Sequence, residues 1–318
     1  MEDFDRSQNI AAPSDLHKIM QKRVGAVMQK RLVLNRLESI KTTLLNSFIK
    51  ENTVGVCLDK RTPRCIVSLT SYPARMKDIH FCLMSLLNQT VKPDEVVLWL
   101  GEEQFPNKEK DIPEIVLNLQ KNGLIIKWTK DIKSYKKLIP ALKQFPNDII
   151  VTADDDIIYK EDWFEKLYRE YQNFGGIVCH RAHKVKLADN GFTPYSMWDK
   201  CITDESCSFF NFATTGGGAL YPPHCFYKDV LNEDLFTKLA ATADDIWFWV
   251  MAVLNGCKIR VMKNPHNSCC FLYPYHNEGE ALYDLNIVEN DKQLYQVLEQ
   301  YPQLLNQLRR EELELQSA

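Results

Sequence analysis

Between Cys65 and Thr152 the chain alternates short apolar segments with longer segments whose apolar residues have helical spacing. This rhythm restricts the fold more than any other feature, because strands that alternate with helices form βαβ units and a parallel sheet. The expected strands are Cys65–Thr70, Glu95–Leu100, Leu124–Trp128 and Asp148–Thr152. The expected helices are Met76–Asn88, Lys108–Lys121 and Ser134–Gln144, the last of them kinked or begun late at Pro140. We therefore predict an α/β fold with a mainly parallel sheet flanked by helices.

The second half of the chain is less regular. We expect a helix over Glu161–Asn173, a helix that opens at Thr242 to Asp245 and ends at Asn255, and a polar C-terminal helix broken near Pro302. Short strands are expected at Gly176–Cys179, Ala219–Tyr221 and Lys258–Met262. The predicted organisation is a helical extension over residues 1–50, a main domain over residues 60–290 and a helical tail over residues 291–318.

The N-terminal extension is basic and has helical spacing of apolar residues. Its cations are Lys18, Lys22, Arg23, Lys30, Arg31, Arg36, Lys41 and Lys50. One interpretation is a helix or hairpin packed on the main domain. The others are a helix that binds a protein partner, or a peripheral contact with anionic lipid.

Composition excludes several classes of function. The net charge of −3 gives no global sign of nucleic-acid binding. The ten cysteines include no CxxC pair, so a zinc site is not expected. The first residues are polar and acidic rather than those of a signal peptide, and no apolar run reaches the ~20 residues that span a bilayer. We therefore expect a cytoplasmic protein with reduced thiols.

Three consecutive aspartates, Asp154, Asp155 and Asp156, follow the expected strand that ends at Thr152. Adjacent like charges repel, and each costs free energy to desolvate, so a cation is expected to neutralise them. If the strand continues into the triplet, Asp154 and Asp156 share one face and Asp155 takes the other. Two carboxylates on one face can bind Mg²⁺ or Mn²⁺, and the bound ion then has open coordination positions for phosphate oxygens. The alternative is a solvated acidic turn or a helix N-cap.

Other motifs accompany the triplet in a fixed order. The strand that contains Ser68 to Thr70 leads into Ser71-Tyr72-Pro73, the glycine run Gly216-Gly217-Gly218 comes later, and Asp244-Asp245 opens a helix. Together these segments resemble nucleotide-sugar glycosyltransferases of the GT-A fold, family-2-like, and in particular bacterial enzymes that build capsule or lipopolysaccharide glycans. The resemblance covers about Cys65 to Met262.

The resemblance implies a GT-A (Rossmann-like) sheet, a nucleotide-sugar donor and a DxD motif at Thr152 to Asp156. Asp156 would be a direct metal ligand, Asp154 would face the ribose or a metal-bound water, and His276 is a candidate to complete the metal shell. The other expected donor-binding residues are Thr70, Tyr72, Arg75, Lys137, Asp155 and Arg181. Asp155 would lie on the opposite face of the strand, which favours a structural role for it. We expect one of the two lysines, Lys136 and Lys137, to be solvated. His266 is a second candidate for the metal shell.

The acceptor side is expected at the glycine run and the acidic helix start. Glycine lets the backbone approach a sugar closely at Gly216, Gly217 and Gly218, and Trp247 is a candidate for stacking on a sugar face. Asp245 is the expected general base of an inverting transfer, with Asp244 ranked second because it suits an N-cap. The structural alternative makes both residues helix caps. The expected acceptor is a glycan or lipid-linked glycan, with no role for nucleic acid.

Three other functions stay open at this point. A retaining transferase on the same fold would not use Asp245 as a base toward the acceptor. A sugar nucleotidyltransferase also uses aspartates and a metal, but its first strand usually leads into a glycine-rich loop, whereas Thr70 to Pro73 has no glycine. A glycan-binding or assembly protein without catalysis would show no metal-dependent affinity for nucleotides.

Overall fold

The computed structural model describes residues 29–46, 48, 54–189, 191–262, 269–272 and 282–317. The chain divides into two compact units, Met1–Thr43 and Leu44–Ala318. Residues 29–46 are helical, as the spacing of apolar residues in the extension predicts. Leu32, Val33 and Leu34 of this helix are exposed.

A mixed eight-stranded sheet forms the centre of the second unit, with the strand order β10-β13-β6-β12-β4-β1-β2-β3. Its strands are β1 Cys65–Thr70, β2 Glu95–Gly101, β3 Leu124–Thr129, β4 Ile149–Thr152, β6 Ile177–Cys179, β10 Ser206–Ser208, β12 Ala219–Tyr221 and β13 Ile259–Val261. β3, β2, β1 and β4 are parallel neighbours, and β13 is parallel to β6. β12 is antiparallel to both β4 and β6, and β10 is antiparallel to β13. The predicted α/β fold with a mainly parallel sheet is confirmed.

Three small two-stranded sheets accompany the large one. Their strands are β5 Ile157–Tyr159 with β14 Cys269–Phe271, β7 Ala182–Lys184 with β11 Asn211–Ala213, and β8 Leu187–Ala188 with β9 Gly191–Phe192. β5 follows the aspartate triplet directly, and its pairing with β14 brings the backbone N–H of Leu272 to the carbonyl of Asp156 at 2.7 Å. The acidic turn is therefore anchored by Leu272, which comes much later in the chain.

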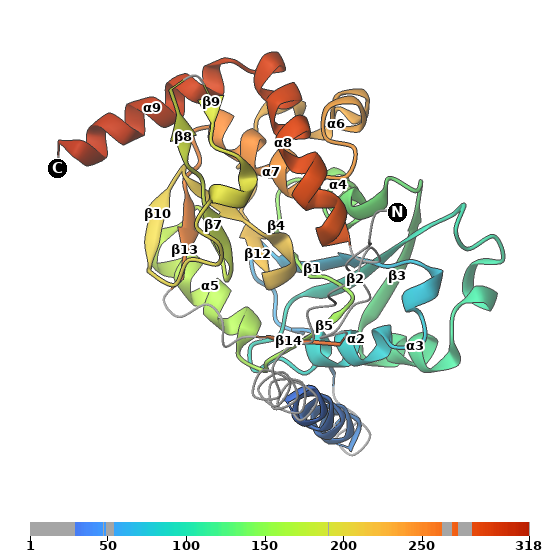
Figure 1. Ribbon diagram of the computed structural model, residues 1–318. Coiled ribbons are helices and arrows are strands. Elements are labelled where there is room, and N and C mark those ends of the chain that lie inside the picture. The colour runs from blue at the N-terminus through green and yellow to red at the C-terminus, as the bar shows by residue number, and fades with distance from the viewer. Residues whose placement is uncertain are drawn as a thin grey trace, which may run out of the picture. The chain divides into compact units, whose positions relative to one another are not determined.

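Helices lie on both sides of the large sheet (Figure 1), as βαβ connections require. The α-helices are α2 Ile79–Leu87, α3 Glu114–Asn118, α4 Ile139–Gln144, α5 Trp163–Phe174, α6 Glu233–Leu239, α7 Asp244–Leu254, α8 Leu282–Gln300 and α9 Gln303–Gln316. Short 3₁₀ helices are η1 Pro73–Arg75, η2 Lys108–Asp111, η3 Leu119–Asn122, η4 Lys133–Lys137, η5 Tyr195–Met197, η6 Thr215–Gly217 and η7 Lys228–Leu231. α2 and α3 lie below the sheet in the view of Figure 1, and α4, α6, α7 and α8 lie above it.

One of the predicted helices is wrong in extent, and another begins late at Pro140, as predicted. The segment Lys108–Lys121 is divided into η2, α3 and η3, because Ile112 precedes Pro113 and takes the extended conformation that a following proline imposes. The segment Ser134–Gln144 is divided into η4 and α4 at Leu138, and Pro140 then lies in the first turn of α4, where its missing N–H costs nothing.

An extensive apolar core lies on the side of the sheet that α7 covers. Ile66 and Ile150 belong to this core together with most of α7, whereas their strand neighbours Val67 and Val151 are equally buried but outside it. This alternation is the period of two that a strand with both faces covered requires. α8 and α9 contribute Leu294, Val297, Leu304 and Leu308 to the same core, so the C-terminal helices are part of the folded unit.

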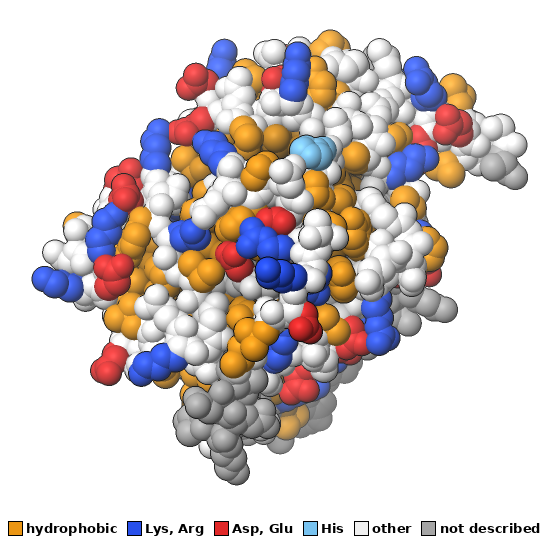
Figure 2. Space-filling view, turned by 180° about the vertical axis from the view of Figure 1, so that it is seen from behind, with side chains coloured by type: hydrophobic (Ala, Val, Ile, Leu, Met, Phe, Trp, Pro, Cys, Tyr) orange, Lys and Arg blue, Asp and Glu red, His pale blue; other side chains and the backbone are white. Residues whose placement is uncertain are grey.

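The surface carries both signs of charge close together. On the face shown in Figure 2, Lys and Arg side chains alternate with Asp and Glu side chains, and apolar side chains lie between them. Near the middle of this face, a small group of basic side chains lies directly against acidic ones. The mixture agrees with the net charge of −3 for the whole chain.

Candidate active site

Two loops meet at the carboxyl ends of β1 and β4. These strands are parallel neighbours, so the loops that follow them leave the same edge of the sheet. The hydroxyl of Ser71, after β1, donates a hydrogen bond to Oδ2 of Asp155, after β4. Arg75 Nη2 lies 3.4 Å from Oδ2 of Asp156. The two loops therefore meet at one edge of the sheet.

Each aspartate of the triplet has a different partner. β4 ends at Thr152, and a turn at Asp155 and Asp156 leads into β5, so the strand does not continue through the triplet. Asp154 pairs with Lys137, and Asp156 pairs with Arg75. Burial raises the pKa of the Asp155 carboxyl to about 7, although the hydrogen bond from Ser71 acts in the opposite direction. The structure thus gives Asp155 the task of joining two loops.

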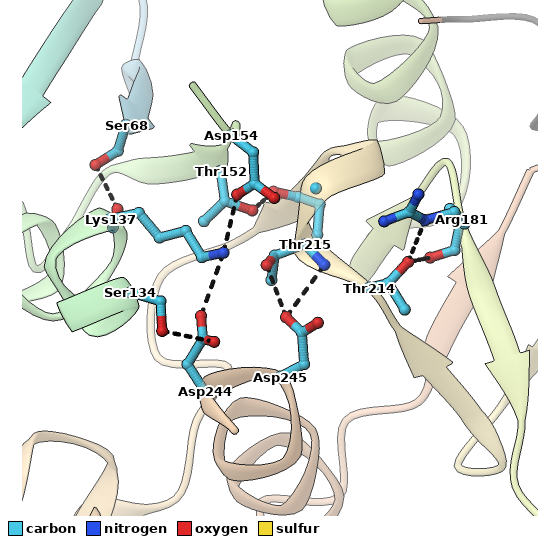
Figure 3. Close-up of polar contacts among 12 residues, drawn as sticks. Ser68, Ser134, Lys137, Thr152, Asp154, Arg181, Thr214, Thr215, Asp244 and Asp245 are labelled. Atoms are coloured by element: carbon cyan, nitrogen blue, oxygen red, sulfur yellow. Dashed lines mark hydrogen bonds and ion pairs between the residues drawn. The ribbon is translucent and has the colours of Figure 1, made fainter. Parts of the chain in front are cut away.

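Lys137 is the centre of the polar network (Figure 3). Its ammonium lies 2.9 Å from Oδ1 of Asp154 and 3.2 Å from Oδ2 of Asp244, and only 5% of the residue is exposed. Burial lowers the pKa of Lys137, but the two carboxylates raise it by more, and the net result lies well above the usual value. A buried ammonium that keeps its charge links the aspartate triplet to the start of α7.

The backbone of Lys137 is fixed as firmly as its side chain. Its carbonyl accepts a hydrogen bond of 2.6 Å from the hydroxyl of Ser68 in β1, and Ser68 accepts one of 3.0 Å from Nε1 of Trp99 in β2. These contacts connect η4 to the centre of the sheet. Lys136, the other lysine of the pair, is also buried and contacts Asp131 and Gln104. The expectation that one of these lysines is solvated is therefore wrong.

Asp244 and Asp245 open α7, but neither is its cap. The N-cap is Ala243, so Asp244 is the first helical residue, and the predicted N-cap role of Asp244 is wrong. Oδ1 of Asp244 accepts a hydrogen bond of 2.9 Å from Ser134. Its Oδ2 faces Lys137 as an ion pair whose geometry is not that of a hydrogen bond. Asp244 is thus occupied by two groups of the protein.

Among the residues that the structure describes, the hydrogen-bond partners of Asp245 are uncharged. Its Oδ1 accepts hydrogen bonds from the Thr215 hydroxyl at 2.7 Å and from the Thr215 backbone N–H at 3.2 Å. Burial and the neighbouring charge of Asp244 raise the pKa of Asp245 to about 6, while Lys137 and Thr215 act in the opposite direction. A carboxyl that titrates close to neutral pH is suited to proton transfer.

The glycine run lies directly against Asp154 and Arg181. A Cβ at Gly216 would be 2.5 Å from Oδ2 of Asp154, and a Cβ at Gly217 would be 2.7 Å from Cβ of Arg181. Gly218 has a φ of +104°, and its missing Cβ would overlap the ring of Trp163. All three positions therefore require glycine because of close approach, backbone conformation or both.

Aromatic side chains hold the carbonyls of this run in place. The Tyr159 hydroxyl donates to the carbonyl of Gly216 at 2.9 Å and accepts from the N–H of Asp154 at 2.8 Å. Trp163 Nε1 donates to the carbonyl of Gly217 at 2.9 Å. The run thus has a fixed position next to Asp154, which a flexible hairpin would not have.

The other expected donor-binding residues lie around this edge of the sheet. Thr70 donates to the carbonyl of Trp99 at 2.8 Å. Tyr72 is 44% exposed, and Arg75 Nε donates to its hydroxyl at 3.2 Å. Arg181 Nε donates to the hydroxyl of Thr214 at 2.5 Å. The exposed ring of Tyr72 is available to a planar ligand.

The predicted role of Trp247 in sugar stacking is wrong, and the two candidate histidines of the metal shell fall outside the described residues. Trp247 is fully buried, and its Nε1 donates to the carbonyl of Val230 at 3.1 Å, so it belongs to the core rather than to an acceptor loop. The helical spacing of Trp247 with Val250 and Met251 places them on the covered side of α7. His276 and His266 lie outside the described residues.

Sequence reasoning missed the hydroxyl groups that organise the carboxylates. Ser134 binds Asp244, Thr215 binds Asp245, and Tyr159 joins Asp154 to the glycine run. Their only signal was the nearness of Thr215 and Tyr159 to motifs in the sequence. Hydroxyl-bearing residues are common in every loop, so this signal was too weak to single them out.

The carboxylates fit one part of a divalent-cation site. Among the described residues, no three His, Cys, Asp or Glu side chains gather into a complete ligand set. Mg²⁺ is commonly bound by one or two carboxylates together with phosphate oxygens and water. Asp154 and Asp156 supply the two carboxylates, both partly exposed at the sheet edge. The donor set therefore suits a hard cation that a phosphate ligand shares.

No protein-family model and no curated protein sequence matches the chain. Among solved structures, S. aureus TarS 1-349 in complex with UDP-GlcNAc is similar with a TM-score of 0.47 and 17% identity, over 74% of this chain and 66% of that chain. In another crystal structure of TarS 1-349 the match spans 59% of that chain, less than two thirds of its length.

Two further structures are similar at lower scores. The mannosyltransferase PcManGT from Pyrobaculum calidifontis, in complex with GDP-Man and Mn²⁺, has a TM-score of 0.40 and 15% identity, over 72% of this chain and 67% of that chain. The inositol-1-phosphate CTP transferase from T. maritima has a TM-score of 0.40 and 14% identity, over 73% of this chain and 98% of that chain. At these identities the likeness concerns the course of the backbone alone. In the described part of the chain, no helix has the length and apolarity to cross a membrane.

Proposed function

We propose that this chain is a metal-dependent glycosyltransferase that moves a sugar from a nucleotide-sugar donor to a hydroxyl group of a glycan, with inversion at the anomeric carbon. The observation that carries the proposal is the pair of carboxylate groups on either side of Lys137. One group, Asp154 with Asp156, suits a cation and a diphosphate. The other offers Asp245, whose pKa of about 6 suits a general base.

The residues divide into a donor side and an acceptor side. When bound, a divalent cation neutralises the charge of the leaving nucleoside diphosphate as a Lewis acid. Asp156 and Asp154 would hold that cation, the exposed ring of Tyr72 would stack on the nucleotide base, and Arg75 and Arg181 would face donor phosphate. Lys137 keeps the Asp154 carboxylate in place and compensates the charge of Asp244 beside the base.

Asp245 carries the proton transfer in this proposal. It would accept the proton of the acceptor hydroxyl while the hydroxyl oxygen attacks the anomeric carbon and the bond to the diphosphate breaks. Thr215 holds Oδ1 of Asp245 through two hydrogen bonds. In the network of Figure 3, Asp245 and Asp154 come from different elements, α7 and the turn after β4, as a base and a donor site on opposite sides of the sugar require.

The first test is a screen of nucleotide sugars with and without metal. UDP-, GDP- and CMP-linked sugars are incubated with the protein and Mn²⁺ or Mg²⁺, and released nucleotide is measured in the presence of simple glycosides. We expect release from one donor class, loss of release with excess chelator, and loss in Asp156→Asn, which removes one negative charge from the cation site while leaving a folded protein. Full activity of Asp156→Asn, or full activity in chelator, would contradict the metal-dependent site.

The same preparation separates the alternative reactions. A nucleotidyltransferase would form pyrophosphate from a nucleoside triphosphate and a sugar phosphate, whereas the proposed enzyme releases a nucleoside diphosphate or monophosphate from a finished nucleotide sugar. The anomeric configuration of the product, read by NMR, separates inversion from retention. Pyrophosphate formation or a retained configuration would replace the proposed reaction.

The acceptor that we propose is a bacterial surface glycan such as capsule or lipopolysaccharide, in free or lipid-linked form, extended on the cytoplasmic side of the membrane. The basic helix over residues 29–46 would contact anionic lipid or a protein partner there. It carries Lys30, Arg31 and Arg36 beside the exposed Leu32 and Leu34. Deleting Met1 to Lys50 should leave donor hydrolysis intact and weaken sedimentation with phosphatidylglycerol vesicles. An insoluble deletion variant would show instead that the segment belongs to the core.

A further inference from the structure

A small cavity lies at the start of α7, next to the carboxyl group of Asp245. Its volume is about 20 Å³, and it is lined by Tyr195, Phe212, Ala243, Asp244, Asp245, Ile246 and Asn290. A space of this size holds one water molecule or one hydroxyl group. Polar surface dominates its lining, because two carboxyl groups and an amide face it. The cavity therefore adjoins the base that the proposed function requires.

Asn290, on α8, brings an unused hydrogen-bonding atom to this cavity. The residue is 4% exposed, and its Oδ1 has no hydrogen-bond partner among the residues that the structure describes. Buried polar side-chain atoms nearly always have a partner, because an unpaired one destabilises the folded protein. Because Oδ1 of Asn290 has no partner within the described ranges and lies beside a cavity, we infer that a group of a ligand supplies the missing hydrogen bond.

The position of Asn290 is fixed by its neighbours on α8. Oδ1 of Asp291 accepts a hydrogen bond of 2.7 Å from the N–H of Tyr195. Oε1 of Gln293 accepts one of 3.0 Å from the N–H of Thr242, and its Nε2 donates one of 2.9 Å to the hydroxyl of Thr242. α8 is therefore attached to the elements on both sides of the cavity, and Asn290 is held facing it.

We propose that Asn290 binds a hydroxyl group of the carbohydrate acceptor next to the hydroxyl that Asp245 deprotonates, so that α8 forms one wall of the acceptor site. This inference rests on the proposed function. An amide offers a donor and an acceptor side by side, so it can bind a hydroxyl group in either sense. Tyr195 and Phe212 complete the lining of the cavity, and because both are buried they leave room there for one hydroxyl group rather than for a sugar ring.

The first measurement is stability, because a ligand-binding role and a structural role predict opposite results. Asn290→Leu removes an unpaired buried amide, so we expect an unchanged or higher melting temperature. The matched control is Gln293→Leu on the same helix, which removes a buried amide that has partners and should lower the melting temperature. If Asn290→Leu lowers the melting temperature as much as Gln293→Leu does, Asn290 is structural and the inference fails. Asn290→Ala replaces the leucine variant if that variant does not fold.

The second measurement is binding of simple acceptors. Saturation-transfer NMR with p-nitrophenyl glycosides of glucose, galactose, mannose and N-acetylglucosamine reports binding without a donor or turnover. We expect the wild-type protein to bind at least one glycoside and Asn290→Leu to bind it roughly two- to tenfold more weakly, as the loss of one hydrogen bond implies. Nucleotide affinity should be the same in both proteins. Equal glycoside affinity in the two proteins, or no binding of any glycoside by the wild type, would overturn the inference.

These readouts separate the inference from the proposed function. Glycoside binding that depends on Asn290, in a protein that turns over no nucleotide sugar, would support the acceptor wall and refute the transferase. Nucleotide-sugar turnover with equal acceptor affinity in wild type and Asn290→Leu would support the transferase and refute the role of Asn290.

Discussion

The two acidic segments, Asp154 to Asp156 and Asp244 with Asp245, contain the same residue type and differ in what surrounds it. In the first segment every carboxylate has a specific partner, and two of the three partners are cations. In the second, Asp244 pairs with Lys137, and the hydrogen-bond partners of Asp245 within the described ranges are the hydroxyl and the N–H of Thr215. The comparison teaches that partners, more than position in a motif, decide which carboxylate holds a cation and which can accept a proton.

Lys137 connects the two segments, so its substitution should cause the largest loss of stability. Lys137→Met leaves the buried carboxylate of Asp244 and that of Asp154 without their shared cation, and loss of one partner of a buried ion pair costs about 3–5 kcal/mol. Urea unfolding followed by tryptophan fluorescence measures the loss. The double variant Lys137→Met with Asp244→Asn should recover part of it, because the uncompensated charge of Asp244 is then removed as well.

A matched control for Lys137 is Lys130→Met. Lys130 pairs with Glu233, but its side chain is 68% exposed, so its removal should change stability little. If Lys137→Met is no more destabilising than Lys130→Met, the two segments are not linked through a buried charge.

The glycine run next to Asp154 allows a sharper test of the first segment alone. Gly216→Ala places a methyl group 2.5 Å from Oδ2 of Asp154. Overpacking of this kind lowers the free energy of unfolding by about 1–3 kcal/mol. Because the carboxylate must move, nucleotide affinity in the presence of Mn²⁺ should fall, while Asp245 keeps its partners. Calorimetric titration with nucleoside diphosphates measures this.

Gly256→Ala is the control for the glycine substitution. Gly256 has a φ of +75° and nothing within 4 Å of a Cβ, so alanine there brings backbone strain of about 1–2 kcal/mol without a clash. It should destabilise the protein and leave nucleotide affinity unchanged. Equal nucleotide affinities in the two alanine variants would mean that Gly216 does not position Asp154.

The smallest expected effect concerns the second segment and depends on pH. The folded protein raises the pKa of Asp245 from 3.8 to about 6, so the ionised carboxyl destabilises the fold at neutral pH. Asp245→Asn should therefore be more stable than wild type above pH 6, with an advantage that shrinks as pH falls from 6 toward 4. Thermal unfolding across this range provides the measurement.

Asp244→Asn gives the opposite sign and completes the comparison. Asp244 pairs with Lys137, so its loss removes a favourable partner of a buried cation and should lower stability at neutral pH. A destabilising Asp245→Asn, or a stabilising Asp244→Asn, would reverse the roles that the two carboxyls have here.

Much of the sheet could be predicted because apolar runs are a strong local signal. β1 has the predicted bounds, and β2, β3 and β4 differ by one residue at one end. The extent of a helix was harder to predict at Pro113, since apolar spacing does not show where the backbone turns away, whereas Pro140 marked the late start of α4. The alternation of strands and helices along the chain does not determine the order of the strands in the sheet. The antiparallel position of β12 between β4 and β6 became visible only in the structure.

The carboxylates of the site could be predicted, and their partners could not. A run of three aspartates is unusual enough to be noticed in a sequence, whereas Lys136-Lys137 looks like any solvated pair of lysines. The burial of Lys137 depends on a carboxylate that is 107 positions away in the chain, at Asp244. Asn290 gave no signal at all, because a single asparagine in a polar helix acquires meaning only from the cavity that it faces.

A single preparation of Asp245→Asn shows most directly whether Asp245 is the base of a transfer from a nucleotide sugar. Nucleotide affinity with Mn²⁺ and the rate of transfer to a glycoside are measured together with the wild type, using the donor and the glycoside that the screens identify. We expect unchanged nucleotide affinity and a transfer rate that falls by a general-base factor of roughly 10²–10⁴. We also expect that the wild-type rate falls as pH drops through about 6, where Asp245 becomes protonated. Unchanged transfer in Asp245→Asn, or loss of nucleotide affinity together with transfer, would show that Asp245 is not the base.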